Sequence, residues 1–236
     1  MKHLAVIVSA GKGRRMGMEQ KKQFLCLKKI PVLSQTLMAF DRCETIDAII
    51  LVVPKADQVY CRKKILAPLS ISKPIHMAEG GEERQDSVFN GIKKVLSIIE
   101  RTDNVIVLVH DGVRPFVDAD LINDVINHAD KYGAAVPCIG LTDTVKLRSD
   151  TGFIEKTLDR EKLFCAQTPQ AFKLNLLRGA FDYANQTRFK GTDDASLVEH
   201  LGHEVFITKG SRINIKITTP EDLVVAEQII RTFDLK

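Results

Sequence analysis

Three uninterrupted apolar runs constrain the fold of this chain more than any other feature of its sequence. Residues 4–8, 48–53 and 105–109 are made only of aliphatic side chains. A strand without polar alternation is buried on both faces, which is typical of a parallel sheet with helices on either side. The sequence therefore predicts an α/β fold, with three layers around a mostly parallel, twisted sheet.

Periodicity and turn signals predict the other elements. Residues 83–99 are the clearest helix, because apolar side chains recur along one helical face. The segment TPED at residues 219–222 opens another, with Thr219 as its N-cap and Pro220 in its first turn. Further helices are expected over 31–40, 121–132 and 174–184, after 192–194, and after Pro54 with Val59, Ile65 and Leu66 on the apolar side; further strands are expected over 74–78, 133–141, 205–208 and 213–217.

Residues 143–158 interrupt this alternation of strands and helices. Two short segments flank the turn SDTG at residues 149–152, which predicts a β-hairpin. Its mixed polarity gives the hairpin little to pack on within its own chain. Two interpretations have equal weight: a contact with a partner subunit, or an excursion over the surface.

A glycine-rich loop directly follows the first strand. Gly11 and Gly13 let the backbone turn with its N–H groups exposed. Arg15 and Lys22 are among the cations that crowd the next positions, 14–22. A loop with bare N–H groups and several cations suits a polyphosphate.

Two common phosphate-binding loops do not fit this segment. No stretch of the chain has the P-loop spacing G-x-x-x-x-G-K-[ST]. The dinucleotide fingerprint G-x-G-x-x-G requires an acidic residue about 20 positions further on. Here the third glycine comes one residue late, and the second strand ends in Pro54 and Lys55. An NAD-dependent reductase is therefore disfavoured.

Composition limits the size, partners and location of the protein. The 236 residues can bury a full core, and a net charge of +4 is too small to indicate nucleic acid or a membrane surface. The five cysteines are scattered and lack a C-x-x-C pair, which is typical of reduced thiols. No apolar run approaches the roughly 20 residues of a membrane span. We expect residues 1–236 to form one domain. We also expect the protein to be located in the cytoplasm.

Six further motifs follow the glycine loop in order. With the loop, they make the chain closely resemble the polyol-phosphate cytidylyltransferases, from its first strand to its last helix. The resemblance implies a Rossmann-like nucleotidyltransferase fold and a homodimer, in which the hairpin, residues 142–160, is an arm exchanged between subunits. The motifs are GGEERQDSV at 80–88, HDGVRP at 110–115, DT at 143–144, QTPQ at 167–170, TDDAS at 192–196 and NIKIT at 214–218.

The resemblance also implies a reaction, in which a phosphomonoester oxygen attacks the α-phosphorus of CTP and pyrophosphate leaves. Two polyanions must meet, so catalysis is expected from cations and a metal ion. By resemblance, Arg15 and Lys22 stabilise charge on the α-phosphate and leaving group, and Arg160 and Lys216 position the incoming phosphate. The alternative is that these are solvated cations.

Asp111 directly follows the strand at 105–109, where open α/β sheets place ligands. It is expected to bind Mg²⁺ through a carboxylate oxygen, the alternative being a carboxylate that caps backbone N–H groups. The resemblance further implies that backbone groups beside Gly81 read the base edge, and that Thr144 and Arg160 serve the neighbour's active site. It implies a CTP site that comprises Ala10, Gly11, Gly13, Gly81, Ser87 and Gly112, and a polyol-phosphate site that comprises Arg114, Thr144, Arg160 and Thr192.

The chain departs from the family pattern at a few positions, and two rival functions stay open. Lys21 stands where a proline is usual, and Gly112 and Val113 replace two alanines. The acceptor is expected to be 2-C-methyl-D-erythritol 4-phosphate, because residues 143–146 and 191–199 resemble the enzymes that use it more than those that use D-ribitol 5-phosphate. A non-catalytic nucleotide-binding protein would not explain the later cations, and three Tyr with no Trp offer little for base stacking.

Overall fold

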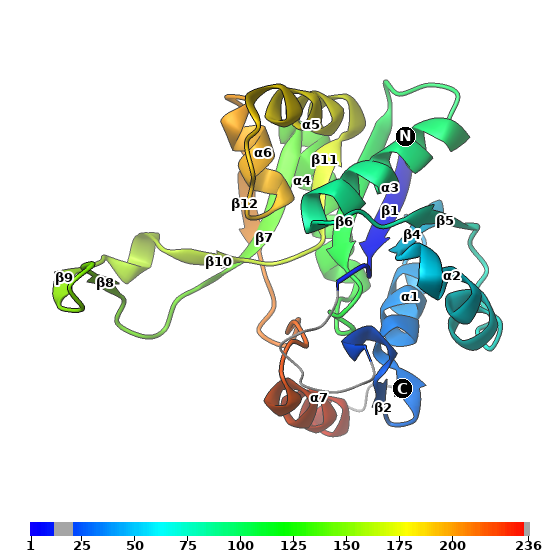
Figure 1. Ribbon diagram of the computed structural model, residues 1–236, viewed down its shortest axis with the longest axis horizontal. Helices are drawn as coiled ribbons and strands as arrows, with labels where there is room; N and C mark the ends of the chain where they lie inside the picture. Colours follow the sequence, from blue (N-terminus) through cyan, green and yellow to red (C-terminus); the bar gives the residue numbers. More distant parts are fainter. Residues whose placement is uncertain (12–20, 234–236) are drawn as a thin grey trace.

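A central sheet of eight strands runs through the part of the chain that the computed structural model describes, residues 1–11 and 21–233 (Figure 1). Gly13 and Arg15 lie outside these described residues. The strands are β1 (Lys2–Val8), β4 (Ala48–Val53), β5 (Ile75–Glu79), β6 (Val105–Asp111), β7 (Ala134–Gly140), β10 (Phe164–Ala166), β11 (Gln170–Lys173) and β12 (Phe206–Lys209).

The three apolar runs form the middle of this sheet and pair in parallel. β1 lies between β4 and β6, and Val8 at its end is opposite Asp111. Successive residues of β1 enter different cores, because side chains alternate across a strand: Val6 packs in one core and Ile7 in the other. Both are fully buried. The predicted burial on both faces is confirmed.

Helices cover both faces of the sheet, which confirms the predicted three-layered α/β architecture. The helix predicted over 83–99 begins where Glu83 and Asp86 form a capping box. The face of Val6 is covered by α3 (Arg84–Ile98), α5 (Leu174–Thr187) and α6 (Asp194–His200), and the face of Ile7 by α1 (Val32–Arg42) and α4 (Ala119–Tyr132).

Beyond β6, the sheet contains two strands that the sequence did not predict. β11 runs antiparallel between β6 and β7, and β10 lies antiparallel to β7. Both are short, and Gln170 begins β11 with a polar side chain, so neither has the apolar run of a buried strand. β12 restores the parallel direction beside β7. The sheet is thus mostly parallel, as predicted.

A third, smaller core lies at the carboxyl ends of the central strands (Figure 1). There α7 (Pro220–Thr232) packs on β2 (Cys26–Leu27), which pairs with β3 (Ile30–Pro31), and Leu27, Ile217 and Ile229 belong to this core. The helix opens at Thr219 and Pro220, as predicted.

The strand predicted over residues 213–217 is wrong. The segment is irregular, and Ile217 N donates a hydrogen bond to Val113 O at 2.9 Å outside any sheet. Ile217 is fully buried in the third core. The apolar alternation that resembles a strand therefore reflects packing on α7.

The helix expected after β4 is only partly correct. The chain forms a 3₁₀ turn (Lys55–Asp57), a short α-helical segment, α2 (Gln58–Tyr60), and a π-helical segment (Cys61–Leu66). Because the period changes along this stretch, the buried side chains are Cys61 and Ile65, while Val59 is 63% exposed.

The predicted hairpin is confirmed, since β8 (Lys146–Arg148) pairs antiparallel with β9 (Ile154–Thr157). Figure 1 shows it at the far end of an extended arm that projects away from the sheet. Phe153 and Ile154 on the arm are 77% and 65% exposed. Within the described ranges, no helix has the length and apolar character needed to cross a bilayer.

Candidate active site

A cleft of about 260 Å³ opens at the carboxyl ends of β1 and β6. Its walls come from the end of β1, from the 3₁₀ turn η2 (Lys22–Phe24), from the loop before α3 and from the irregular segment before α7. It brings together side chains that lie far apart in the sequence. Of the residues predicted for binding and catalysis, Ala10, Gly11, Lys22, Gly81, Ser87, Asp111 and Lys216 line it.

A buried glutamine fixes η2 against the end of β1. Gln23 is 1% exposed, and its Nε2 donates a hydrogen bond to Ser9 O at 3.2 Å. Ser9 N donates to Val52 O at 2.8 Å, which ties the same residue to β4. Lys22, adjacent to Gln23, is thereby held at the cleft wall.

Lys21 restrains the same segment with an ion pair. Its Nζ lies 2.7 Å from Oδ1 of Asp57, whose side chain is mostly buried. The backbone angles of Lys21, φ −63° and ψ 134°, are ones that proline also adopts. The ion pair therefore restrains, before Lys22, a conformation that a proline would fix covalently.

The loop before α3 closes tightly around Ser87. Gly81 N donates to Ser87 Oγ at 2.9 Å, and that hydroxyl donates to Glu83 O at 3.0 Å. A Cβ atom at Gly81 would collide with Asp86. The turn thus requires glycine and leaves Gly81 without a side chain at the cleft wall, where a flat base can approach the backbone.

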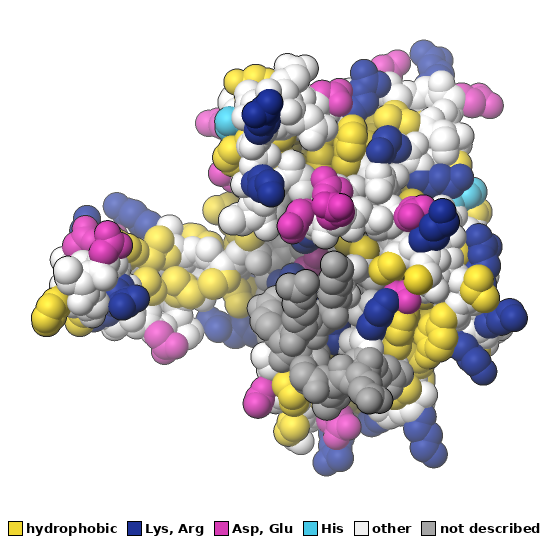
Figure 2. Space-filling model, viewed as in Figure 1, with side chains coloured by type: hydrophobic (Ala, Val, Ile, Leu, Met, Phe, Trp, Pro, Cys, Tyr) yellow, Lys and Arg dark blue, Asp and Glu magenta, His cyan; other side chains and the backbone are white. Residues whose placement is uncertain are grey.

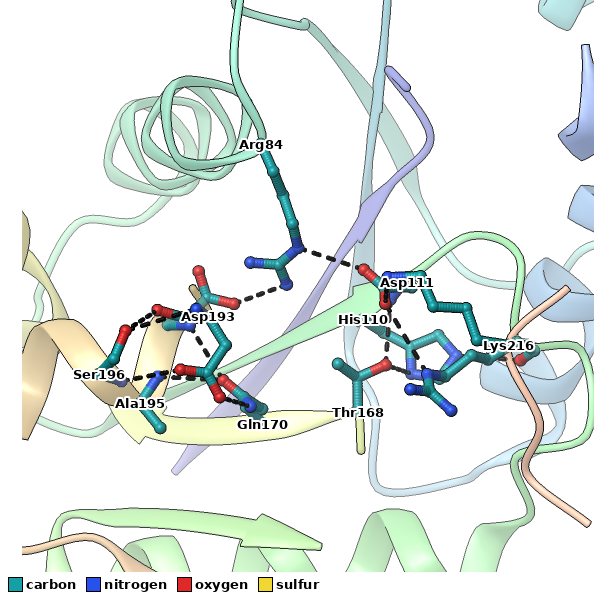
Figure 3. Close-up of polar contacts among 11 residues, drawn as sticks. Arg84, His110, Asp111, Thr168, Gln170, Asp193, Ala195, Ser196 and Lys216 are labelled. Carbon is teal, nitrogen blue, oxygen red and sulfur yellow. Dashed lines mark hydrogen bonds and ion pairs between the residues drawn. The ribbon is translucent and has the colours of Figure 1, made fainter. Parts of the chain in front are cut away.

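Asp111 lies in the cleft within a cluster of cations (Figure 3). Its Oδ1 accepts a hydrogen bond from Arg84 Nε at 3.2 Å, and its Oδ2 lies 2.8 Å from Lys216 Nζ and 3.7 Å from Arg114 Nε. Burial opposes ionisation, but these cations outweigh it and hold the pKa of Asp111 well below its usual range. At neutral pH this carboxylate is an anion that orients its cationic neighbours.

His110, beside Asp111, contributes no charge to the cluster. It is fully buried, with Nδ1 3.0 Å from Thr168 Oγ1 and Nε2 3.0 Å from Arg114 O. Burial lowers the pKa of His110 to about 4. The ring is therefore neutral at pH 7 and serves to hold the backbone of Arg114.

The sequence motifs indicate no individual role for Arg84, although this residue lies within the motif at residues 80–88. Its guanidinium bridges Asp111 and Asp194, with Nη2 2.8 Å from Asp194 Oδ2. Burial disfavours its charge, but the two carboxylates raise the pKa of Arg84 above its usual range. The sequence feature that could have indicated this role is the position of Arg84 three residues after Gly81. There the first turn of α3 faces the end of β6.

Gln170 joins the start of α6 to β11 (Figure 3). Its Oε1 accepts hydrogen bonds from Asp194 N at 3.1 Å and Ala195 N at 3.0 Å, and its Nε2 donates to Asp193 Oδ2 at 2.7 Å. These contacts fix the helix start that follows Thr192.

The remaining predicted residues do not line the cleft. Thr144 and Arg160 are exposed on the arm, where Arg160 Nη1 donates to Thr142 O at 2.6 Å, and Thr192 is exposed before α6. Arg114 reaches Asp111 and donates through Nη1 to Asn214 O at 2.7 Å. Gly112 packs closely on Ser9. Gly13 and Arg15, predicted for CTP binding and catalysis, lie outside the described residues.

This combination of fold and site defines a class of protein. A ligand cleft at the carboxyl ends of parallel strands, with a glycine-rich wall and a cluster of cations, suits a nucleotide whose phosphates are being transferred. The class is that of the nucleotidyltransferases.

A family model described as 2-C-methyl-D-erythritol 4-phosphate cytidylyltransferase matches residues 3–232. The chain belongs to this family. A relative of that name from Clostridium novyi is 43% identical over 229 residues, covering 97% of this chain and 96% of the relative. Another from Syntrophotalea carbinolica is 46% identical over 227 residues, covering 96% and 95%.

Solved structures agree with this assignment. The 4-diphosphocytidyl-2C-methyl-D-erythritol synthase of Anaerococcus prevotii superposes with a TM-score of 0.84 at 32% identity, covering 98% of each chain. The 2-C-methyl-D-erythritol 4-phosphate cytidylyltransferase of Thermus thermophilus gives 0.77 at 31% identity, covering 98% of this chain and 100% of the other. The predicted nucleotidyltransferase fold is confirmed.

Proposed function

We propose that this protein transfers the cytidylyl group of CTP to 2-C-methyl-D-erythritol 4-phosphate and releases pyrophosphate, a step in the synthesis of isoprenoid precursors. The observation that carries the proposal is that Lys22, Gly81, Asp111 and Lys216, from four distant segments, line one cleft. These residues supply the cations, the base-facing backbone and the carboxylate that the reaction needs.

The reaction joins two polyanions. An oxygen of the acceptor phosphate attacks the α-phosphorus of CTP, a new P–O bond forms, and the bond from the α-phosphorus to the bridging oxygen breaks. Pyrophosphate leaves with that electron pair. Because the second pKa of a phosphomonoester is about 6, the attacking oxygen is already anionic and needs no general base. The barrier is repulsion, which fixed cations lower.

The cations of the cleft divide this task. Lys22, together with Arg15, stabilises charge on the α-phosphate and the leaving group, while Lys216 positions the incoming phosphate. Asp111 holds Lys216 in place through their 2.8 Å ion pair. Arg114 pairs with the same carboxylate from behind the cleft wall, and the acceptor phosphate is assigned to it together with Lys216.

Magnesium fits Asp111 if the substrate supplies most of its ligands. The carboxylate is ionised and lines the cleft, but the described residues contain no group of three or more His, Cys, Asp or Glu side chains that could hold a metal ion. Mg²⁺ is commonly bound by one or two carboxylates together with phosphates and water. Asp111 would hold such an ion, which neutralises phosphate charge when bound.

The backbone around Gly81 selects the base. Its N–H is used by Ser87, so neighbouring backbone groups read the cytosine edge while Ser87 fixes the turn. Ala10, Gly11 and Gly13 receive the triphosphate, and Gly112 allows the end of β6 to lie close to Ser9.

The arm supports a homodimer in which arms are exchanged. Figure 2 shows hydrophobic side chains along the projecting arm, and Leu147, Phe153 and Ile154 are among the exposed apolar residues there. Burial of such side chains against a partner would stabilise a dimer. Thr144 and Arg160 would then complete the partner's polyol-phosphate site, next to Thr192.

The five cysteines of the protein are free thiols, which suits a location in the cytoplasm.

Pyrophosphate release tests the reaction. The protein is incubated with Mg²⁺, with each of the four ribonucleoside triphosphates, and with either 2-C-methyl-D-erythritol 4-phosphate or D-ribitol 5-phosphate. Release only with CTP and the methylerythritol phosphate is expected. A preference for D-ribitol 5-phosphate would show that this compound is the acceptor instead. The absence of release with CTP and either acceptor would exclude the proposed cytidylyltransferase activity.

Mixing two inactive variants tests arm exchange. In a heterodimer of Arg160→Ala and Lys216→Ala subunits, exchanged arms leave one active site with both side chains intact. Random reassociation should therefore restore about a quarter of wild-type activity. If each arm serves its own subunit, every site lacks one cation and the mixture stays inactive.

A further inference from the structure

A second cavity, of about 570 Å³, shares no lining residue with the cleft. It lies between α1, the β2–β3 turn, residues 115–119 and α7. Its size falls within the range of small-molecule sites. Most of its lining is apolar, including Ile30, Met38, Phe116, Val117 and Ile230.

Two cations belong to the wall of this cavity. Lys28 and Arg42 line it, and both are exposed. Lys28 and its neighbour Lys29 form the two-residue turn between β2 and β3 with φ of 46° and 70°. Such hairpin turns favour Asn and Gly, because the left-handed region is sterically unfavourable for other residues. A strained turn thus carries a lysine to the cavity wall.

The acidic residue of the lining is already engaged. Asp118 caps α4, where its Oδ1 accepts a hydrogen bond from Leu121 N at 2.8 Å. Its charge faces the positive end of that helix, which offsets it. The cavity therefore combines an apolar body with a cationic edge.

Two of the segments that line the cavity continue along the chain to residues of the active site. Pro115 and Phe116 directly follow Arg114, and Ile213 directly precedes Asn214, whose carbonyl accepts a hydrogen bond from Arg114 at 2.7 Å. Lys216 follows in the same segment. A ligand in the cavity would thus contact the two segments that carry Arg114 and Lys216.

We propose that this cavity is a second ligand site, and that it takes an amphiphilic anion. The apolar part of the ligand packs against Met38, Phe116 and Ile230. Its anionic group lies toward Lys28 and Arg42, since these cations complement its charge. The cleft already described binds the substrates and is separate from this site.

A pair of fluorescent probes tests the proposal on the full chain. 8-Anilinonaphthalene-1-sulfonate has an apolar body and an anionic group, and N-phenyl-1-naphthylamine is its uncharged counterpart. We expect the sulfonate to bind one site per chain, with CTP present or absent. Lys28→Gln and Arg42→Gln should each weaken its binding about three- to fivefold, the range of an exposed charge pair, and change the uncharged probe by less than about twofold.

Two substitutions that fill the cavity decide the location. Ala39→Trp and Ala119→Trp, at partly or fully exposed lining positions, should abolish binding of both probes. Ala67→Trp and Lys64→Gln, at exposed positions elsewhere, are the matched controls and should leave binding unchanged. Wild-type affinity in both cavity-filling variants, equal effects of the charge variants on both probes, or displacement of the sulfonate by CTP would each overturn the proposal. Because binding is measured directly, this result does not depend on the proposed reaction.

Discussion

The ammonium of Lys216 lies 2.8 Å from the carboxylate of Asp111 and joins the irregular segment before α7 to the end of β6. The irregular path of residues 213–217 buries Ile217 in the third core and leaves Lys216 at the cleft. A regular strand there would have bonded through its backbone to the sheet. The ion pair instead gives this segment a fixed place in the active site.

Replacing Lys216 should remove charge stabilisation without unfolding the protein. For Lys216→Met we expect kcat to fall about 10²–10³-fold, the usual effect of losing one such donor. Stability should change little, because Arg84 and Arg114 still neutralise Asp111. Pyrophosphate release and urea unfolding measure the two effects, with Lys209→Met on β12 as the control. A kcat within threefold of wild type would remove Lys216 from the reaction.

Asp111→Asn should destabilise the fold by about 2–3 kcal/mol at pH 7, because it leaves partly buried cations without their anion. The pKa of Asp111 is lowered in the folded protein, so its contribution is present above its unfolded pKa of about 3.9 and is lost as the pH falls further. The difference in unfolding free energy should thus be constant from pH 7 to 5 and shrink below about pH 4. Urea unfolding across this range measures it, and a difference that shrinks already near pH 6 would contradict the assignment.

His110 should make stability fall between pH 7 and pH 5. Its pKa of about 4 in the folded state lies below the usual 6.5, so the unfolded chain binds the proton more readily. The stability that neutral His110 contributes is present above pH 6.5 and is lost as the pH falls toward 4. Over pH 7 to 5 this loss is about 2 kcal/mol. His110→Asn should remove that part of the slope, whereas the exposed His203→Asn should keep it.

The ion pair of Lys21 with Asp57 should be replaceable by a proline. Lys21→Ala is expected to lower kcat several-fold, because the segment before Lys22 loses its restraint, and to leave the KM for CTP less affected. Lys21→Pro should retain most activity, since φ is already −63°. Lys55→Ala, two residues before Asp57 in the sequence, is the control. Equal losses in Lys21→Ala and Lys21→Pro would show that the ammonium acts for another reason.

The sequence was sufficient for the centre of the fold because burial on both faces leaves a simple pattern. β1, β4 and β6 contain the uninterrupted apolar runs 4–8, 48–53 and 105–109, and α3 has a regular apolar face. β10 and β11 escaped prediction because they are short and Gln170 is polar, although it is buried and fully engaged with the start of α6. Residues 213–217 were wrongly predicted as a strand because their alternating apolar side chains resemble one, whereas these side chains pack on α7.

Much of the candidate cleft followed from motifs rather than from patterns of burial. Gly81 and Lys216 were placed at the site by resemblance, and Asp111 by its position directly after the strand at 105–109; the structure brings all three to one cleft. Arg84 escaped because a sequence does not show that the first turn of α3 faces the end of β6. Thr144 and Arg160 are exposed on the arm and do not line the cleft of their own chain, so the role proposed for them depends on the proposed exchange of arms.

Isotope tracing in the product tests the central claim most directly. The protein is supplied with CTP and with 2-C-methyl-D-erythritol 4-phosphate whose phosphate carries ¹⁸O, and the products are followed by ³¹P NMR. If the acceptor phosphate attacks the α-phosphorus, the product is a diphosphate diester that retains all of the ¹⁸O, and the released pyrophosphate contains none. Label in the pyrophosphate, or the absence of a diester product, would contradict cytidylyl transfer by this cleft.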